Sequence, residues 1–81
     1  MRILPLNEIQ IEYLKERQLL KKFQKCSDIF ENNPHHPSLN TEVLEPKYLK
    51  IYSFRIDKKY RAVFIVKDGL AEIINITNHY K

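Results

Sequence analysis

The fold is decided by residues 60–77, which read YRAVFIVKDGLAEIINIT. Two β-rich stretches, Tyr60 to Lys67 and Leu70 to Thr77, flank the dipeptide Asp68-Gly69, which is a strong hairpin signal. The block Ala62 to Val66 is apolar on both faces, so it is expected in the centre of a sheet. This stretch therefore predicts an antiparallel hairpin whose first strand is a central one.

A third strand is expected to precede this hairpin. Residues Lys50 to Ile56 alternate between apolar and polar side chains, and the pattern breaks at Asp57-Lys58-Lys59. If the turn centres on Lys58, Arg55 pairs directly with Arg61 on one face of the sheet. Two like charges so placed destabilise the strand pair by up to about 1 kcal/mol, and an incoming phosphate would relieve that cost.

The N-terminal part is expected to supply one short strand and the helices. Arg2 to Leu6 can form a strand, which Pro5 and the helix-capping residue Asn7 would end. Apolar residues recur at helical spacing from Glu8 to about Glu31. The pattern loosens at Lys15 to Gln18, so one long helix and two packed helices both fit it.

The helical region stops at Asn32-Asn33-Pro34, and the prolines Pro34, Pro37 and Pro46 favour an extended loop after it. The order of elements is then a strand, a helical segment and a three-stranded antiparallel meander. This order predicts an α+β fold, a single domain over residues 1–81, with the helices packed on one sheet face and the other face partly free.

Composition and charge limit the classes of function. The chain has 81 residues, one cysteine and no apolar run that approaches the ~20 residues of a membrane span. With no apolar signal segment after Met1, these features indicate a soluble protein of the reducing cytoplasm. The net charge is +4, and residues 41–81 hold eight basic and five acidic side chains. A polyanion is therefore expected to dock on the C-terminal half.

Three residue types in that half fit the cleavage of RNA without a metal. A 2′-hydroxyl attacks the neighbouring phosphate when a base takes its proton, cations neutralise the phosphorane and an acid protonates the departing 5′-oxygen. Glu42, the two arginines and His79 are of these types. On chemistry alone Glu45 is an equal candidate for the base. Solvated surface charges and a frayed tail are the simpler interpretation of the same residues.

The C-terminal tail presents one geometric difficulty. Pairing through Asp68-Gly69 sets Ile76 opposite Arg61 and puts Asn78, rather than His79, on the Arg61 face. A bulge or bend after Ile76 is needed to bring His79 round to that face. The apolar strand that precedes the tail argues that the tail is anchored.

Three segments of the chain resemble the RelE-type toxins of bacterial toxin–antitoxin pairs, the RelE/ParE superfamily, and within it the YoeB-like branch. They are residues 33–39 (NPHHPSL), residues 52–56 (YSFRI) followed by Tyr60-Arg61, and the terminal pair His79-Tyr80. The resemblance covers nearly the whole chain in element order. The spacings from Glu42 to Arg55, from Arg55 to Arg61 and from Arg61 to His79 match the branch without a gap.

The resemblance implies a RelE-like fold and a toxin that cleaves ribosome-bound mRNA without a metal and is held inactive by a cognate antitoxin. It assigns Glu42, rather than Glu45, as the general base and His79 as the general acid. It places Arg55 and Arg61 on the scissile phosphate and Tyr80 in a positioning or stacking role. The product would carry a 2′,3′-cyclic phosphate. No small-molecule cofactor and no membrane are implied.

Lysines and tyrosines of the same half are expected to contact single-stranded RNA, because such sites combine cations with rings on which bases stack. The residues expected to bind RNA are Lys47, Lys50, Tyr52, Lys58 and Lys59. Of the tyrosines, at least Tyr52 or Tyr60 also fits the core. No metal site is expected, since His35-His36 have no Cys or Asp at ligand spacing. Cys26 fits the role of a small buried apolar residue.

Two other functions stay open at the level of sequence. A ParE-like relative would bind DNA gyrase and cut nothing, and a degenerate member would bind only an antitoxin. A gyrase binder has no use for a terminal acid or for Glu42 at the matched spacing. Competent side chains at all five site positions argue against a degenerate member.

Overall fold

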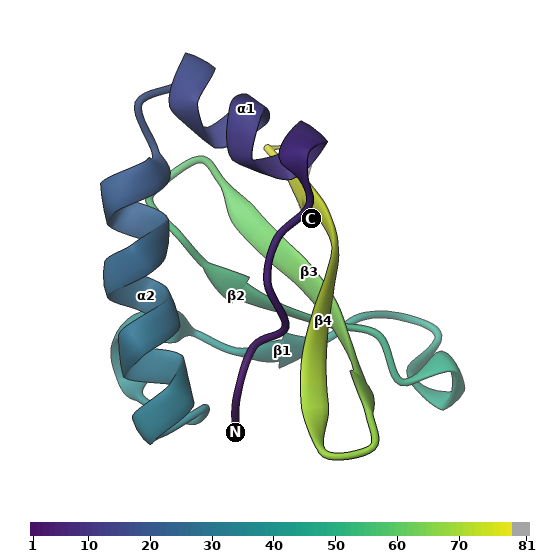
Figure 1. Cartoon of the computed structure of the whole chain (residues 1–81). Coiled ribbons are helices and arrows are strands. Elements are labelled where there is room, and N and C mark those ends of the chain that lie inside the picture. Colours follow the sequence, from purple (N-terminus) through teal and green to yellow (C-terminus); the bar gives the residue numbers. More distant parts are fainter. Residues whose placement is uncertain (79–81) are drawn as a thin grey trace.

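Two helices and a four-stranded antiparallel sheet make up the computed structural model, which describes residues 1–78 (Figure 1). The elements are α1 (Glu8–Glu16), α2 (Leu20–Asn32), β1 (Glu42–Val43), β2 (Tyr52–Arg55), β3 (Arg61–Lys67) and β4 (Leu70–Thr77), with short 3₁₀ turns η1 (Pro37–Leu39) and η2 (Lys47–Leu49). The strands lie in the order β1-β2-β3-β4. The expected α+β class is confirmed.

The region from Glu8 to Asn32 forms two helices and not one long helix. The sequence pattern allows both. Asn7 caps α1 through a capping box: its Oδ1 accepts from the backbone N–H of Gln10 at 2.7 Å, and the Gln10 Oε1 accepts from the Asn7 N–H at 3.0 Å. The α1 helix ends before Gln18, whose φ of 57° is left-handed and cannot continue a right-handed helix. The chain then turns and begins α2 at Leu20.

The core lies between α2 and one face of the sheet. Phe23 and Phe30 of α2 reach the ring of Phe54 in β2, with ring centroids 6.2 and 5.1 Å apart, and Phe30 meets Phe64 of β3 edge-on at 5.1 Å. Phe30 and Phe54 are fully buried. Aromatic pairs of this kind contribute beyond the area that they bury, so these four rings fix the helix on the sheet.

The sheet register confirms the expected pairing of the two arginines. Arg55 of β2 stands directly opposite Arg61 of β3. The turn Asp68-Gly69 joins β3 to β4 with positive φ at both residues, as its sequence predicts. β3 lies between β2 and β4, which confirms its central position.

Two parts of the sheet differ from expectation. Arg2 to Leu6 is not a strand: this segment makes an isolated parallel bridge, in which the Arg2 and Leu4 backbones bond to Ala71 at 2.9 and 2.8 Å. The carbonyl of Ile73, the next acceptor along β4, accepts from the Gln10 side chain instead of from this segment, so the pairing is not extended. A strand instead forms at Glu42–Val43, within the stretch expected to be an extended loop. Two residues are too few for an alternating pattern to reveal it.

A β-bulge interrupts the pairing of β3 with β4. Phe64 pairs with Ile73, but the neighbouring Val63 pairs with Asn75, so Ile74 is an extra residue. As a result Arg61 faces Thr77, not Ile76. The bulge therefore lies at Ile74 and not after Ile76, where a bulge or bend is expected from the sequence.

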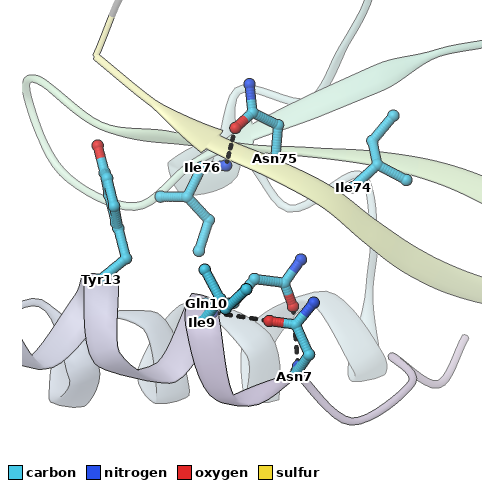
Figure 2. Close-up of a pocket in the computed structure, with 7 residues that line it drawn as sticks. All are labelled: Asn7, Ile9, Gln10, Tyr13, Ile74, Asn75 and Ile76. Carbon is cyan, nitrogen blue, oxygen red and sulfur yellow. Dashed lines mark hydrogen bonds between the residues drawn. The ribbon is translucent and has the colours of Figure 1, made fainter.

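Two side chains form hydrogen bonds with backbone groups of β4 next to this bulge. The Asn75 Oδ1 accepts from the Ile76 N–H at 2.9 Å, and the Gln10 Nε2 of α1 donates to the Ile73 carbonyl at 2.8 Å. Figure 2 shows the first of these bonds and the position of Gln10 between the helix and the strand. The irregular register is thus held by two specific contacts, one of which comes from α1.

A carboxylate stabilises the turn between β2 and β3, in addition to the backbone bonds from Ile56 and Asp57 to the Tyr60 carbonyl. The Asp57 Oδ1 accepts from the backbone N–H groups of Lys59 and Tyr60, both at 2.8 Å, and its Oδ2 lies 3.7 Å from the Nζ of Lys22 in α2. Burial alone would raise the pKa of Asp57, but these hydrogen bonds and the Lys22 charge hold it below its ordinary value. Asp57 therefore pins the register that opposes Arg55 to Arg61.

Replacing Asp57 with alanine is expected to lower the free energy of unfolding by about 2 kcal/mol near neutral pH, because two backbone N–H groups lose a charged acceptor. Since the folded-state pKa is lowered, this contribution is complete above about pH 4 and is lost as the pH falls through the folded pKa. Urea unfolding of the wild type, Asp57→Ala and the control Asp28→Ala at pH 7 and pH 3 measures it. A difference between wild type and Asp57→Ala that is the same at both pH values would contradict the ionic role.

Candidate functional site

A buried arginine forms the centre of the site. Arg61, at the start of β3, is 5% exposed, and Ser53 in β2 is fully buried beneath it. The Nε of Arg61 donates to the Ser53 Oγ at 2.9 Å, and its Nη2 donates to the carbonyl oxygens of Asn40 at 2.5 Å and Ser53 at 3.3 Å. A buried guanidinium is tolerated because such acceptors replace water. These bonds fix its orientation.

Arg55 complements this fixed charge with an exposed one. It stands opposite Arg61 on the same sheet face, and its side chain is open to solvent. Burial lowers the pKa of Arg61 from its usual value; the Glu42 carboxylate acts against that shift, and the Arg55 charge adds to it. A guanidinium nevertheless keeps its proton at neutral pH. The site therefore carries two positive charges whose mutual repulsion an anion would relieve.

Glu42 lies on the same face of the sheet as the arginines. It pairs with Ser53 in the β1–β2 register, and cross-strand partners share a face. Its Oε2 accepts from the Nδ2 of Asn40 at 3.2 Å, and the carbonyl of Asn40 accepts from Arg61. The strands β1, β2 and β3 thus place Glu42, Arg55 and Arg61 on one face of the sheet. Asn40, in the loop before β1, contacts both Glu42 and Arg61.

A pocket of about 220 Å³ opens beside the arginine pair. Its lining is almost entirely polar and consists of Asn40, Arg55, Asp57, Lys58, Lys59, Arg61 and Asn78. Four of these side chains are cationic and one is a carboxylate. Clefts lined mainly by one sign of charge concentrate ions of the other sign, so this pocket favours an anion.

The structure brings some of the residues predicted from sequence together and separates others. Lys58 and Lys59 line the cationic pocket with the arginines, whereas Lys47 and Lys50 lie on the connection between β1 and β2, outside its lining. Tyr52 pairs with Phe64 and stacks on its ring at 5.5 Å. It therefore lies on the helix-covered face, away from the arginines. His79 and Tyr80 lie outside the described residues.

The remaining candidates have local roles. The His36 Nδ1 lies 3.1 Å from the Ser38 N–H and 2.9 Å from the Ser38 Oγ, so this nitrogen is engaged within η1. The Cys26 Sγ lies 3.5 Å from the Ile56 carbonyl, and burial raises the pKa of its thiol, which disfavours the reactive thiolate. Among residues 1–78 no cluster of three or more His, Cys, Asp or Glu side chains could hold a metal ion. No helix in this range could cross a membrane.

Sequence reasoning missed Ser53 and Asn40. Ser53 is a polar residue on an otherwise apolar strand, and its position diagonal to Arg61 follows from the predicted register; that combination is the signal that could have found it. Asn40 gave no such signal, because its contact with Arg61 joins residues 21 positions apart along the chain.

Comparison with known proteins identifies the fold. No protein-family model and no curated protein matches the chain. Among solved structures, a chain of the YoeB–YefM toxin–antitoxin complex from Staphylococcus aureus matches with a TM-score of 0.69 and 22% identity, over 98% of this chain and 94% of that one. The YoeB/ParE toxin from Agrobacterium tumefaciens matches at 0.73 and 19%, over 99% and 100%. YafQ from E. coli matches at 0.72 and 10%, over 96% and 90%. The chain therefore has the fold of these toxins, which confirms the expected RelE-like fold.

Replacing Ser53 with alanine is expected to lower the free energy of unfolding by about 1–3 kcal/mol, because the buried guanidinium loses the hydroxyl that accepts from its Nε. Urea unfolding at neutral pH measures the loss. Ser38→Ala, which removes an exposed hydroxyl in η1, is the control and should remain close to wild type. A Ser53→Ala protein as stable as the wild type would show that this hydroxyl does not hold Arg61.

Proposed function

We propose that the chain is the toxin of a type II toxin–antitoxin pair, a YoeB-like member of the RelE/ParE superfamily, and that it cleaves ribosome-bound mRNA without a metal. The observation that carries the proposal is the placement of Glu42 on the same sheet face as the opposed Arg55 and Arg61. The shared fold of the YoeB and YafQ structures supports it.

The arginine pair suits a phosphate whose charge increases during the reaction. Opposed like charges cost up to about 1 kcal/mol in the empty site, and a bound phosphate removes that cost. Arg61 is also held rigidly by Ser53 and Asn40, so little reorganisation is needed when the phosphorane forms. Fixed donors of this kind provide most of the electrostatic stabilisation in enzyme sites.

The reaction requires a base and an acid on either side of that phosphate. Glu42 takes the proton of the 2′-hydroxyl, whose oxygen then attacks phosphorus. The bond from phosphorus to the 5′-oxygen breaks, and His79 donates a proton to that oxygen. The products are a 2′,3′-cyclic phosphate and a 5′-hydroxyl. Tyr80 would position or stack on a base beside this linkage.

The assignment of His79 rests on chain connectivity. Asn78 is the last residue described and lines the cationic pocket. His79 is the next residue in the sequence. The register shift at Ile74 supports the assignment, because it sets Thr77, rather than Ile76, opposite Arg61.

The cationic surface suits the wider RNA contacts of such an enzyme. Lys58 and Lys59 would bind the RNA phosphates next to the scissile one. Lys47 and Lys50 would bind phosphates further along the RNA. Tyr52, which stacks on Phe64, contributes to the core in this scheme and not to RNA binding. The YoeB–YefM complex of the same fold supports an antitoxin as the partner. In this proposal the antitoxin would cover the cationic surface, and the protein would act in the cytoplasm.

A second candidate, a gyrase-binding toxin that cuts nothing, is raised by the YoeB/ParE structure of the same fold. A binder of that kind has no use for a carboxylate beside the arginine pair. A member that binds only an antitoxin would have no use for it either. Activity on translated message distinguishes all three functions.

The test is to incubate the purified, EDTA-treated and desalted protein with ribosomes translating a defined mRNA, and to map the ends of the message. The wild type is expected to leave 2′,3′-cyclic phosphate ends. Glu42→Gln and His79→Ala are each expected to reduce the rate by about 10²–10⁴-fold, and Arg55→Gln by about 10²–10³-fold. The matched controls Glu45→Gln and His36→Ala should cleave at the wild-type rate.

Three outcomes would contradict the proposal. Ends that carry a 3′-hydroxyl and a 5′-phosphate would indicate a different chemistry. Cleavage that survives both Glu42→Gln and His79→Ala would remove the assigned base and acid. A wild-type protein that leaves mRNA intact but blocks DNA supercoiling by gyrase would establish the ParE-like function instead.

A further inference from the structure

One residue of the site contacts both the buried cation and the carboxylate. The backbone carbonyl of Asn40 accepts from the Arg61 Nη2 at 2.5 Å, and its side-chain Nδ2 donates to the Glu42 Oε2 at 3.2 Å. Asn40 also lines the cationic pocket. Asn40 therefore links Arg61, which would hold the scissile phosphate, to Glu42, which would take the proton of the 2′-hydroxyl.

The backbone conformation of Asn40 makes this double contact possible. Its φ of 45° and ψ of 52° are left-handed, a region that asparagine tolerates better than most residues apart from glycine. The residue ends η1, where its N–H donates to the Pro37 carbonyl at 3.2 Å, and the preceding Leu39 is fully buried in the core. The buried Leu39 and the bond to Pro37 thus fix the backbone at Asn40. Its carbonyl faces Arg61 and its side-chain amide faces Glu42.

We propose that Asn40 is a positioning residue, which holds the Glu42 carboxylate at a fixed place relative to Arg61. This inference rests on the proposed RNA cleavage. The Asn40 amide donates to Oε2 of Glu42, and Oε1 has both of its lone pairs available to accept the proton of the 2′-hydroxyl. A glutamate side chain on a two-residue edge strand has several rotamers, and the amide selects one of them. A base displaced by about 1 Å loses much of its effect.

Asn40→Gly is the variant that isolates this contact. Glycine adopts the same left-handed backbone and keeps the carbonyl that holds Arg61, so only the amide is lost. Asn40→Asp is its partner: it keeps the size and backbone preference but places a carboxylate against Glu42. Gln18→Gly is the matched control, because Gln18 also has a left-handed backbone and lies in the turn between α1 and α2.

Cleavage of ribosome-bound mRNA by Asn40→Gly is expected to be about 10- to 100-fold slower than by the wild type, and by Asn40→Asp slower again. Binding of a 2′-deoxy, non-cleavable message should be unchanged, as should the midpoint of thermal unfolding. In a Glu42→Gln background Asn40→Gly should have no further effect, because a residue that acts through Glu42 has nothing left to position. Gln18→Gly should cleave at the wild-type rate.

The failures of the two proposals are distinguishable. If Glu42→Gln is slow but Asn40→Gly is as fast as the wild type, the positioning role is wrong and the proposed reaction stands. If Asn40→Gly slows the Glu42→Gln enzyme further, weakens binding of the 2′-deoxy message or lowers the unfolding midpoint, Asn40 acts in another way and the inference is overturned. If Glu42→Gln is as fast as the wild type, both the base and its positioning residue are wrong.

A second measurement does not depend on activity. The side-chain couplings of Glu42 in NMR spectra should report one dominant rotamer in the wild type and in Gln18→Gly. In Asn40→Gly they should report averaging over several rotamers. Averaged couplings in the wild type would overturn the inference even in a protein that cleaves nothing.

Discussion

The buried guanidinium of Arg61 is the constraint on which the site depends. A charge removed from water is costly unless acceptors replace the lost hydration, and the described residues supply them from β2 and from the loop before β1. Ser53 and Asn40 therefore do more than fill space. Any other register between β2 and β3 would leave the charge buried without its hydroxyl, so the position of Arg61 and the pairing of these strands require each other.

Irregular features on both sides of Arg61 serve the same register. The Asp57 carboxylate closes the turn into β3, and the bulge at Ile74 resets the pairing of β4, so that Arg61 faces Arg55 on one strand and Thr77 on the other. A slip of one residue would turn every side chain of a strand to the opposite face. The same backbone hydrogen bonds therefore place the aromatic rings on the helix-covered face of the sheet and the arginines on the other face.

Turn chemistry was the part of the sequence that predicted the site best. Asp57-Lys58-Lys59 and Asp68-Gly69 act locally, so the meander and the Arg55–Arg61 pair could be derived from them. The strand Glu42–Val43 could not, because two residues show no period, and Arg2 to Leu6 had strand-like composition but made only a bridge to Ala71. The bond between Asn40 and Arg61 and the contact of Gln10 with the bulged strand join residues 21 and 63 positions apart, which local patterns do not encode.

The different exposure of the two arginines indicates a division of roles. Arg61 is buried and oriented before any ligand arrives, so its electrostatic effect is largest for a charge that develops at one fixed point. Arg55, with Lys58 and Lys59 around the same pocket, is accessible and can follow a flexible polyanion as it approaches. Exposed cations mainly increase the rate and strength of encounter, whereas a desolvated one distinguishes a transition state from a ground state. One buried and oriented guanidinium next to an exposed one therefore fits the proposed chemistry on a phosphate.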